Sequence, residues 1–378
     1  MAFKQASRRD TWAEVRLDCI KYNIRMTLQQ FHSDVSLMAM VKADGYGHGA
    51  VETAKAAIEA GAEFLGVALL DEALELRDEG IEAPILVLGR TNPEDALIAA
   101  QKDIRLTAFQ KEWLEEAESY IKGTARLNVH IKVDTGMGRF GMAEEEEIEE
   151  FMGVLRHCCS LHPEGLYTHF ATADSKKTEF FERQYSCFLD NIRLVKEHIG
   201  ELEYIHCGNS AASLRFPERC FNMVRIGISM YGMPPSKEII DDIPFTLQPA
   251  FSIHSRIVQI KEVPQGQNIG YGQAYITTEK EWIATIPIGY ADGWYRQHAS
   301  KGAEVLVDGV RVPIVGRICM DQLMVRLPEY RPIGTKVTMI GSQRQETISA
   351  VEVAERLDTI PYEIPCMISK RVPRIYVS

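Results

Sequence analysis

The sequence predicts an α/β fold: a parallel (β/α)8 barrel over the N-terminal part of the chain, followed by a mostly β C-terminal domain. Short apolar runs alternate with amphipathic helical patterns between residues 36 and 226, and alternating β and α segments of this kind form parallel sheets. Eight such runs in succession favour a closed barrel over a doubly wound sheet, an alternative that the periodicity alone leaves open. Beyond Met233 the helical patterns nearly vanish.

The predicted barrel strands are short, contain β-branched or aromatic residues, and often end beside Gly, Asp or Asn. They are Ser36–Val41, Phe64–Ala68, Pro84–Leu88, Ile104–Ala108, Leu127–Val133, Gly165–His169, Tyr204–Cys207 and Met223–Ile226. The helical patterns between them include Ala50–Ala60, Asp71–Glu79, Glu112–Ile121, Glu144–Cys158 and Thr178–Ile199. The acidic run at 144–147 opens a helix, where the helix dipole favours carboxylates.

A proline-rich stretch separates the two parts. Residues 233–250 contain four prolines, which predicts a linker. We therefore assign residues 1–240 to the barrel domain and residues 241–378 to the mostly β domain. Its predicted strands are Phe251–Val263, Trp282–Pro287, Val305–Val307, Val310–Val315, Leu323–Leu327 and Lys336–Ile340, with a hairpin turn at Asp308-Gly309 and one helix at Ile348–Leu357.

Composition and charge exclude several classes of protein. The 42 Lys and Arg against 53 Asp and Glu give a net charge of −11, which disfavours non-specific binding to nucleic acid or anionic membranes. No apolar run approaches the roughly 18 residues of a membrane span, and the N-terminus lacks the apolar core of a signal peptide. The eight cysteines form no CxxC pair, so we expect reduced thiols and a cytoplasmic protein.

Lys42 is the first candidate for chemistry. It stands at the end of an apolar predicted strand, and glycines follow at 45, 47 and 49, with Tyr46 among them. In a parallel barrel, function concentrates where the strands end and the βα loops begin. A partly desolvated lysine at that rim is a nucleophilic amine suited to a Schiff base, whereas a surface lysine after a strand is the plain structural alternative.

Residues at the ends of the last predicted strands suit an anion. Arg225 lies on the eighth strand and Gly227-Ile228 follow it, and late barrel loops often bind phosphate. Ser210 offers a hydroxyl to the same anion or a role at a helix start, and His169 ends another predicted strand. A strand glycine and a buried core histidine are the structural alternatives here.

The motif GMGRFG at 136–141 matches the dinucleotide pattern GxGxxG, but it sits on the fifth strand of a longer array and lacks a properly placed acid. We find no Walker loop, HExxH or GxSxG motif, and the histidines lack zinc spacing. In the second domain, NIGYG at 268–272 places Tyr271 between glycines, and GRICMDQ at 316–322 ends in polar residues.

Taken together, these segments resemble the alanine racemases, pyridoxal-phosphate enzymes that interconvert L- and D-alanine. The similar segments are AMVKADGYGHG around Lys42, HIKVDTGMGRFG at 130–141, THFATAD at 168–174, NSAA at 209–212, VRIGISMYG at 224–232, GYGQAY at 270–275, IPIGYADGW at 286–294 and GRICMDQ at 316–322. Their order and spacing extend from about residue 35 to the C-terminus, so the resemblance covers nearly the whole chain.

The resemblance implies a role for each matching residue. Lys42 would hold pyridoxal 5′-phosphate as a Schiff base and act as one acid/base, with Tyr271 of the partner subunit as the second. The cofactor contacts it implies are Arg225 at the pyridine nitrogen, Arg139 at the phenolic oxygen, His169 near the ring, and Tyr46, Ser210, Gly227, Ile228 and Tyr362 at the phosphate. It implies that Arg139, together with Met320 of the partner subunit, contacts the substrate. It places Tyr290 near the entrance, with Asp321 nearby as support. It also implies that Lys132 is carbamylated and orients Arg139, and that the site holds no metal.

The implied reaction also has a physical logic. Racemisation removes the Cα proton on one face and returns it on the other, which two bases accomplish without moving the substrate. The resemblance thus implies a cytoplasmic homodimer with shared sites that supplies D-alanine for cell-wall peptidoglycan. A broader amino-acid racemase, a decarboxylase, or a non-catalytic pyridoxal-phosphate binding protein are the alternatives. Arg225 argues against the decarboxylase, which usually carries an acid at the pyridine contact, and the added β domain argues against the binding protein.

Overall fold

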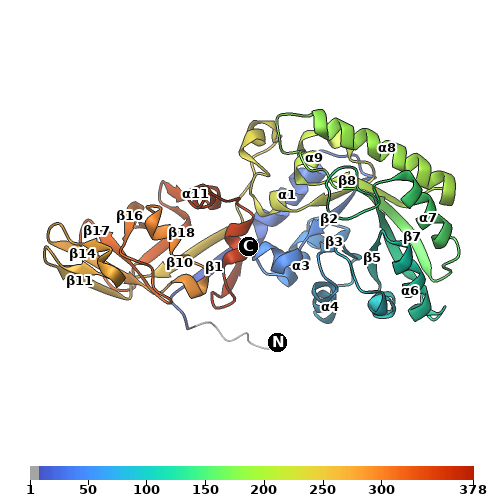
Figure 1. Cartoon of the computed structure of the whole chain (residues 1–378). Helices are drawn as coiled ribbons and strands as arrows, with labels where there is room; N and C mark the ends of the chain where they lie inside the picture. The colour runs from blue at the N-terminus through green and yellow to red at the C-terminus, as the bar shows by residue number, and fades with distance from the viewer. Residues whose placement is uncertain (1–7) are drawn as a thin grey trace. The chain divides into compact units, whose positions relative to one another are not determined.

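The computed structural model describes residues 8–378 and forms two compact units (Figure 1). The barrel unit comprises residues 19–45 and 50–248, and the sheet unit comprises the chain up to Asp18, residues 46–49 and residues 249–378. The short segment 46–49 therefore leaves the barrel unit directly after the loop that begins at Lys42.

The barrel unit is a closed parallel barrel, which confirms the predicted fold class. Each strand pairs with the next in chain order, and the last pairs with the first. The strands are β2 (Ser36–Met40), β3 (Phe64–Val67), β4 (Ile85–Val87), β5 (Ile104–Ala108), β6 (Leu127–Lys132), β7 (Leu161–Tyr167), β8 (Tyr204–Gly208) and β9 (Met223–Ile226).

Helices connect these strands and lie outside them, as Figure 1 shows for α6, α7 and α8. Every residue of β2, β3, β4, β5 and β9 is buried, as expected for parallel strands covered on both faces. The helices are α1 (Leu17–Leu28), α3 (Ala50–Glu59), α4 (Leu70–Asp78), α5 (Ala96–Gln101), α6 (Lys111–Ile121), α7 (Glu145–Leu155), α8 (Glu179–Ile199) and α9 (Ser210–Arg215). The short element α2 (Lys42–Tyr46) is a turn with left-handed backbone angles.

One barrel strand begins earlier than the sequence predicted. The prediction placed it at Gly165–His169, whereas β7 spans Leu161–Tyr167. Pro163 argues against a strand interior because it cannot donate a ladder hydrogen bond. The structure accommodates it beside a register shift between Val129 and His130 of β6.

The sheet unit consists mainly of antiparallel strands, in agreement with the predicted mostly β domain. Its main order is β11-β14-β17-β16-β15-β18-β10-β1-β20. These strands are β1 (Trp12–Arg16), β10 (Phe251–Arg256), β11 (Gln259–Val263), β14 (Glu281–Ile286), β15 (Glu304–Val307), β16 (Val310–Val315), β17 (Leu323–Leu327), β18 (Lys336–Gln343) and β20 (Arg374–Val377). Shorter elements are β12 (Asn268–Ile269), β13 (Tyr275–Ile276), β19 (Glu346–Ile348), α10 (Gln297–Ser300), α11 (Ala350–Arg356) and α12 (Glu363–Met367).

Two features of this unit differ from the predicted strands. Strand β1 lies between β10 and β20, although the domain assignment placed residues 1–240 with the barrel. The predicted strand Phe251–Val263 is two strands, because the Ile257 N–H donates to Thr335 and the Val258 N–H to Thr285. The chain thus changes pairing partner between these two residues. The predicted turn at Asp308-Gly309 is confirmed, with φ of 52° and 81° as a type I′ hairpin requires.

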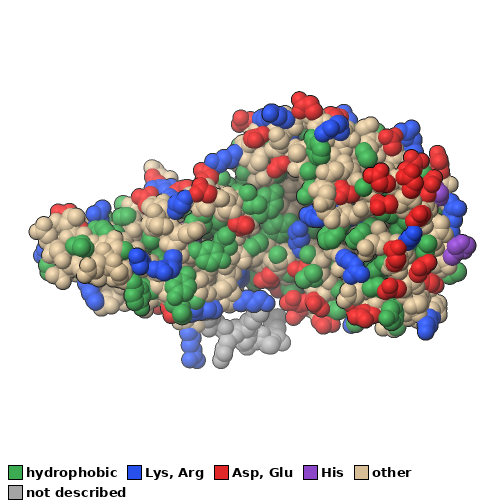
Figure 2. Space-filling view, viewed as in Figure 1, with side chains coloured by type: hydrophobic (Ala, Val, Ile, Leu, Met, Phe, Trp, Pro, Cys, Tyr) green, Lys and Arg blue, Asp and Glu red, His purple; other side chains and the backbone are tan. Residues whose placement is uncertain are grey.

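The surface reflects the acidic composition. On the face shown in Figure 2, Asp and Glu side chains gather over the barrel unit near α7, whose first turn carries Glu145, Glu146 and Glu147. Among residues 8–378, no helix combines the length and apolar character needed to cross a membrane.

Candidate active site

Lys42 follows β2 and begins an unusual turn. The four residues after it, Ala43, Asp44, Gly45 and Tyr46, have φ of 52°, 53°, 61° and 52°. For residues other than glycine, this left-handed conformation costs roughly 1–2 kcal/mol each. Such strain persists only where the surroundings impose it, and it clusters at functional sites.

Two carboxylates hold this turn. Glu72 of α4 accepts the Ala43 N–H at 2.6 Å through Oε1, and its Oε2 accepts the N–H groups of Ala68 and Leu69 at 2.8 and 3.2 Å. Asp44 Oδ1 accepts the Ala50 N–H at 2.9 Å. The backbone that carries Lys42 is therefore tied to the starts of α3 and α4.

Arg225 of β9 is a buried cation held by neutral acceptors, and it is only 3% exposed. Its NH1 donates to His206 Nδ1 at 2.9 Å and to the His206 carbonyl at 3.2 Å. Its NH2 donates to the Thr168 carbonyl at 2.8 Å and to His169 Nδ1 at 3.1 Å. Burial lowers its pKa. Within residues 8–378 its Nε–H has no hydrogen-bond partner, so this donor remains for another group.

Further positive charge surrounds Arg225. Lys132, at the end of β6, is buried with its Nζ 4.5 Å from the centre of the Tyr167 ring. Burial and the charges of Arg225 and Arg139 lower the pKa of Lys132 to about 7. Burial and the same arginines, with Lys132, hold the pKa of His169 well below its usual value.

The glycine motif at 136–141 closes around a carboxylate. Asp134 accepts the N–H groups of Gly136, Met137 and Arg139 at 2.9, 2.7 and 3.0 Å. Burial would raise the pKa of Asp134, but these backbone donors outweigh it and lower the pKa. A Cβ on Gly141 would lie 2.7 Å from Asp134 N. The motif therefore places Arg139 beside the barrel rim. Its glycines are explained by this tight turn around Asp134 and not by a dinucleotide site.

Hydroxyl and backbone donors gather around Ser210, at the start of α9. The Ser210 Oγ accepts the Gly227 N–H at 2.9 Å, and Ile228 begins a short 3-10 helix directly after Gly227. The hydroxyls of Ser213 and Ser229 are buried and have no hydrogen-bond partner among residues 8–378. These unused donors suit an oxyanion. The Asn209 side chain, which accepts the Ala212 N–H, is the helix cap.

The remaining predicted residues lie on the sheet unit. Tyr271 lies between Gly270 and Gly272, with φ of 76° and 68°, and is 69% exposed. Met320 is also exposed. The N–H groups of Tyr290 and Ala291 donate to the carbonyls of Cys319 and Met320 at 3.1 and 3.0 Å, which joins these two loops.

Three more predicted residues belong to this unit. Asp321 accepts a hydrogen bond from Arg371 at 2.7 Å. The rings of Tyr46 and Tyr362 lie 6.2 Å apart, and burial raises the pKa of Tyr46. A Cβ on Gly47 would lie 2.2 Å from the Pro365 carbonyl, so glycine permits the close approach of the two segments that carry these tyrosines.

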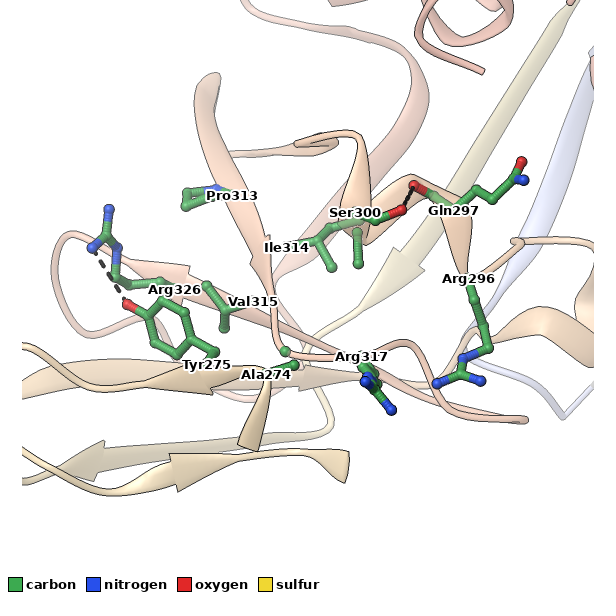
Figure 3. A pocket seen from close by; sticks show the side chains of 12 residues that line it. Ala274, Tyr275, Arg296, Gln297, Ser300, Pro313, Ile314, Val315, Arg317 and Arg326 are labelled. Atoms are coloured by element: carbon green, nitrogen blue, oxygen red, sulfur yellow. Dashed lines mark hydrogen bonds between the residues drawn. The ribbon is translucent and has the colours of Figure 1, made fainter. Parts of the chain in front are cut away.

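A cavity of about 640 Å³ opens beside the Tyr271 loop (Figure 3). Ile314 and Val315 are among its buried lining residues, and Arg296, Arg317 and Arg326 are exposed on its wall. Arg326 donates to the Tyr275 hydroxyl at 3.4 Å. Tyr271 itself is not a lining residue, but a Cβ on Gly272 would lie 3.0 Å from Arg317.

The structure thus groups the predicted residues in two sets. The barrel unit carries Lys42, Lys132, Arg139, His169, Ser210, Arg225, Gly227 and Ile228, and the sheet unit carries Tyr46, Tyr271, Tyr290, Met320, Asp321 and Tyr362. Sequence reasoning missed His206, His130 and Glu164. Their signal was a titratable side chain inside or beside an apolar run predicted as a barrel strand.

Comparisons with known proteins give concordant matches along the chain. Residues 15–235 match the family model "Alanine racemase, N-terminal domain", and residues 250–376 match "Alanine racemase, C-terminal domain". The alanine racemase of Geobacillus stearothermophilus is 53% identical over 368 residues, covering 97% of this chain and 94% of the relative.

Solved structures agree with these matches. The alanine racemase of Bacillus anthracis with bound L-Ala-P has a TM-score of 0.96 at 51% identity, covering 98% of this chain and 96% of that one. A histidine racemase of Leuconostoc mesenteroides has a TM-score of 0.92 at 32% identity, covering 99% of each chain. The fold therefore occurs in racemases named for different amino acids.

Proposed function

The chain belongs to the alanine racemase family, and from this premise we propose that it interconverts L-alanine and D-alanine with pyridoxal 5′-phosphate as its cofactor. The observation that carries the proposal is the arrangement at the barrel rim. A strained turn presents Lys42, and a buried cationic group, Arg225, keeps one donor unused.

The donor set fits that cofactor. Arg225 would donate its Nε–H to the pyridine nitrogen, and Lys42 would bind the cofactor covalently through its amine. The phosphate would be held by Ser210, Gly227, Ile228, Tyr46 and Tyr362. The unpartnered hydroxyls of Ser213 and Ser229 beside Ser210 show that this region holds hydrogen-bond donors in excess of the chain's own acceptors. Arg139 would contact the phenolic oxygen, with His169 near the ring.

When bound, the cofactor acts as an electron sink that makes the substrate Cα–H acidic. Lys42 and Tyr271 then divide the proton transfers: one side chain removes the Cα proton from one face, and the other returns a proton to the opposite face. Met320 and Arg139 would orient the substrate carboxylate. Tyr290 and Asp321 would support these loops.

Tyr271 would act from the partner subunit of a homodimer. Tyr271, Met320 and Tyr290 are large apolar side chains left exposed on adjoining loops, and such groups mark interaction sites. Mixing the Lys42→Ala chain with the Tyr271→Phe chain tests this assignment. Each pure variant should be nearly inactive, and verified heterodimers should regain activity at their one intact site. Heterodimers without recovered activity would contradict shared sites.

The reaction itself is tested by loss of optical rotation from L-alanine, with the Lys42→Ala chain as the control. L-Histidine and other amino acids belong in the same assay, because a histidine racemase shares this fold. Racemisation of several amino acids at similar kcat/KM would favour the broader racemase. Cofactor binding without any turnover would favour the non-catalytic alternative, and release of CO2 would favour a decarboxylase.

The proposal extends to the cellular role. D-Alanine made by this chain would supply cell-wall peptidoglycan, as the resemblance implies, and the reaction would take place in the cytoplasm. We propose neither a nucleic acid nor a membrane as a binding partner of this chain.

A further inference from the structure

A continuous line of hydrogen bonds runs through the barrel interior and ends at Arg225. Glu164 of β7 bonds to His130 Nε2 at 3.0 Å, and His130 Nδ1 bonds to His206 Nε2 at 2.8 Å. His206 Nδ1 then bonds to Arg225 NH1 at 2.9 Å. The first three side chains are almost completely buried, so water does not substitute for these partners.

The proton order along this line follows from its two ends. A guanidinium only donates hydrogen bonds, so His206 Nδ1 must accept from Arg225 and carries no proton. The proton of a neutral His206 is then on Nε2 and is donated to His130 Nδ1. His130 in turn carries its proton on Nε2 and donates it to Glu164, which as a carboxylate only accepts.

The surroundings support this assignment. Burial lowers the pKa of both His130 and His206, which keeps the imidazoles neutral. Burial would raise the pKa of Glu164, but the hydrogen bond from His130 and the charge of Arg105 lower it, which keeps the carboxylate ionised. Arg105 binds Glu164 at 3.1 and 3.3 Å, and Asn128 donates to it at 3.0 Å.

Gly165 shows that the barrel makes room for this line. A Cβ at Gly165 would lie 2.6 Å from His130 Nδ1, the atom that meets His206. Any larger residue at this position would displace the imidazole and break the line at its centre.

We propose that Glu164 is a positioning residue for Arg225: because it only accepts, it favours the same proton order on His130 and His206 that Arg225 requires, and the line so held fixes the guanidinium with its Nε–H unused. The role in catalysis rests on the proposed function, in which that Nε–H meets the pyridine nitrogen. A glutamine at position 164 could either donate or accept, so it would no longer disfavour the opposite proton order. That order puts a proton on His206 Nδ1 and therefore breaks its hydrogen bond with Arg225.

The first test is the proton order in the full-length protein loaded with pyridoxal phosphate. Nitrogen NMR of ring-15N histidine distinguishes the two neutral tautomers from the imidazolium, and variants at positions 130 and 206 assign the signals. We expect both rings as neutral Nε2–H tautomers. An Nδ1–H tautomer or an imidazolium at His206 in the parent chain would overturn the proposal.

The second test compares Glu164→Gln with Arg105→Lys. Both alter the same buried ion pair, but Arg105→Lys keeps the positive charge beside Glu164, and only Glu164→Gln changes the group that His130 meets. We expect Glu164→Gln to add an Nδ1–H population at His206 and to lower kcat at least about tenfold, with KM within about twofold. Arg105→Lys, which keeps that charge, should retain the parent's histidine spectrum and kcat. An unchanged spectrum in Glu164→Gln, or equal loss of kcat in both variants, would refute the positioning role.

Failure of this inference and failure of the proposed function are distinguishable. The histidine spectrum reads proton positions without turnover, whereas racemisation by the parent chain tests the function alone. An active parent with the wrong tautomer would remove only the role of Glu164. An inactive parent with the expected tautomer would leave the proton order intact but remove its link to catalysis.

Discussion

Lys132 combines burial, positive neighbours and an aromatic ring at Nζ, and each affects its chemistry. With the pKa lowered to about 7, a large share of the side chain is a neutral amine at neutral pH. A neutral amine adds to CO2 to give a carbamate and releases one proton, whereas the protonated amine does not react. The carbamate carboxylate would place negative charge beside Arg225 and Arg139. Among the described residues, no carboxylate forms a side-chain salt bridge with either arginine.

We therefore predict that Lys132 is carbamylated when CO2 is supplied. Carbon NMR with 13C-bicarbonate should show a carbamate signal in the parent chain that is absent from the Lys132→Arg chain. The signal should weaken as pH falls below about 7, because protonation removes the reactive amine. The Lys132→Met chain should lose about tenfold in kcat as Arg139 loses its orientation. A parent without the signal at saturating CO2 would exclude the modification.

At the scale of elements, the turn after Lys42 depends on a residue of another element. Glu72 holds the Ala43 N–H and the start of α4, so Glu72→Ala leaves these donors without their acceptor. We predict a loss of about 1–3 kcal/mol in the free energy of unfolding and weaker retention of cofactor on dialysis. Glu75→Ala, an exposed position on the same helix, is the control. Equal cofactor retention in both variants would show that Glu72 does not position Lys42.

The loop that presents Tyr271 depends on a neighbouring glycine. Gly316 has φ of 69°, and a Cβ there would lie 2.6 Å from the Ile269 carbonyl, two residues before Tyr271. Gly266 has a similar φ of 79°, but its Cβ would meet no described atom within 4 Å. Gly316→Ala and Gly266→Ala should therefore each lose about 1 kcal/mol in the free energy of unfolding through backbone strain, measured by urea unfolding. Only Gly316→Ala should lower kcat, by about tenfold; an equal decrease in both would contradict this packing role.

The elements also show where sequence reasoning succeeds. Strands β5 and β9 match their predicted ranges residue for residue, because each is a continuous buried run bounded by loop residues. Strand β1 gave no comparable signal: its residues alternate between buried and more exposed positions, and it pairs with β10 and β20, which lie far along the chain. The line from Glu164 to Arg225 could not be predicted, because it depends on the register of β6, β7, β8 and β9.

At the scale of the whole molecule, the candidate residues are divided between two units, each of which is built from separate segments of the chain. Lys42 belongs to the barrel unit and Tyr46, four residues later, to the sheet unit. Both chain ends contribute strands to the sheet unit, as β1 and β20. The proposed cofactor attachment at Lys42 and the proposed proton transfer by Tyr271 would therefore depend on separately packed regions, and they should respond differently to loss of assembly.

Dilution separates these two requirements. If Tyr271 acts only in the partner subunit, specific activity must fall as the homodimer dissociates, because the site at Lys42 of each monomer then lacks the partner's Tyr271. Cofactor held by Lys42 should persist in the monomers, since the proposed covalent bond and the proposed Arg225 contact would both lie within one chain. We predict that activity per mole follows the dimer fraction measured by sedimentation, while bound-cofactor absorbance per mole changes little. A tandem fusion of two chains is the control, since its linkage keeps the subunits together at any dilution. Full activity in a demonstrated monomer would place both groups in one chain and exclude the shared site.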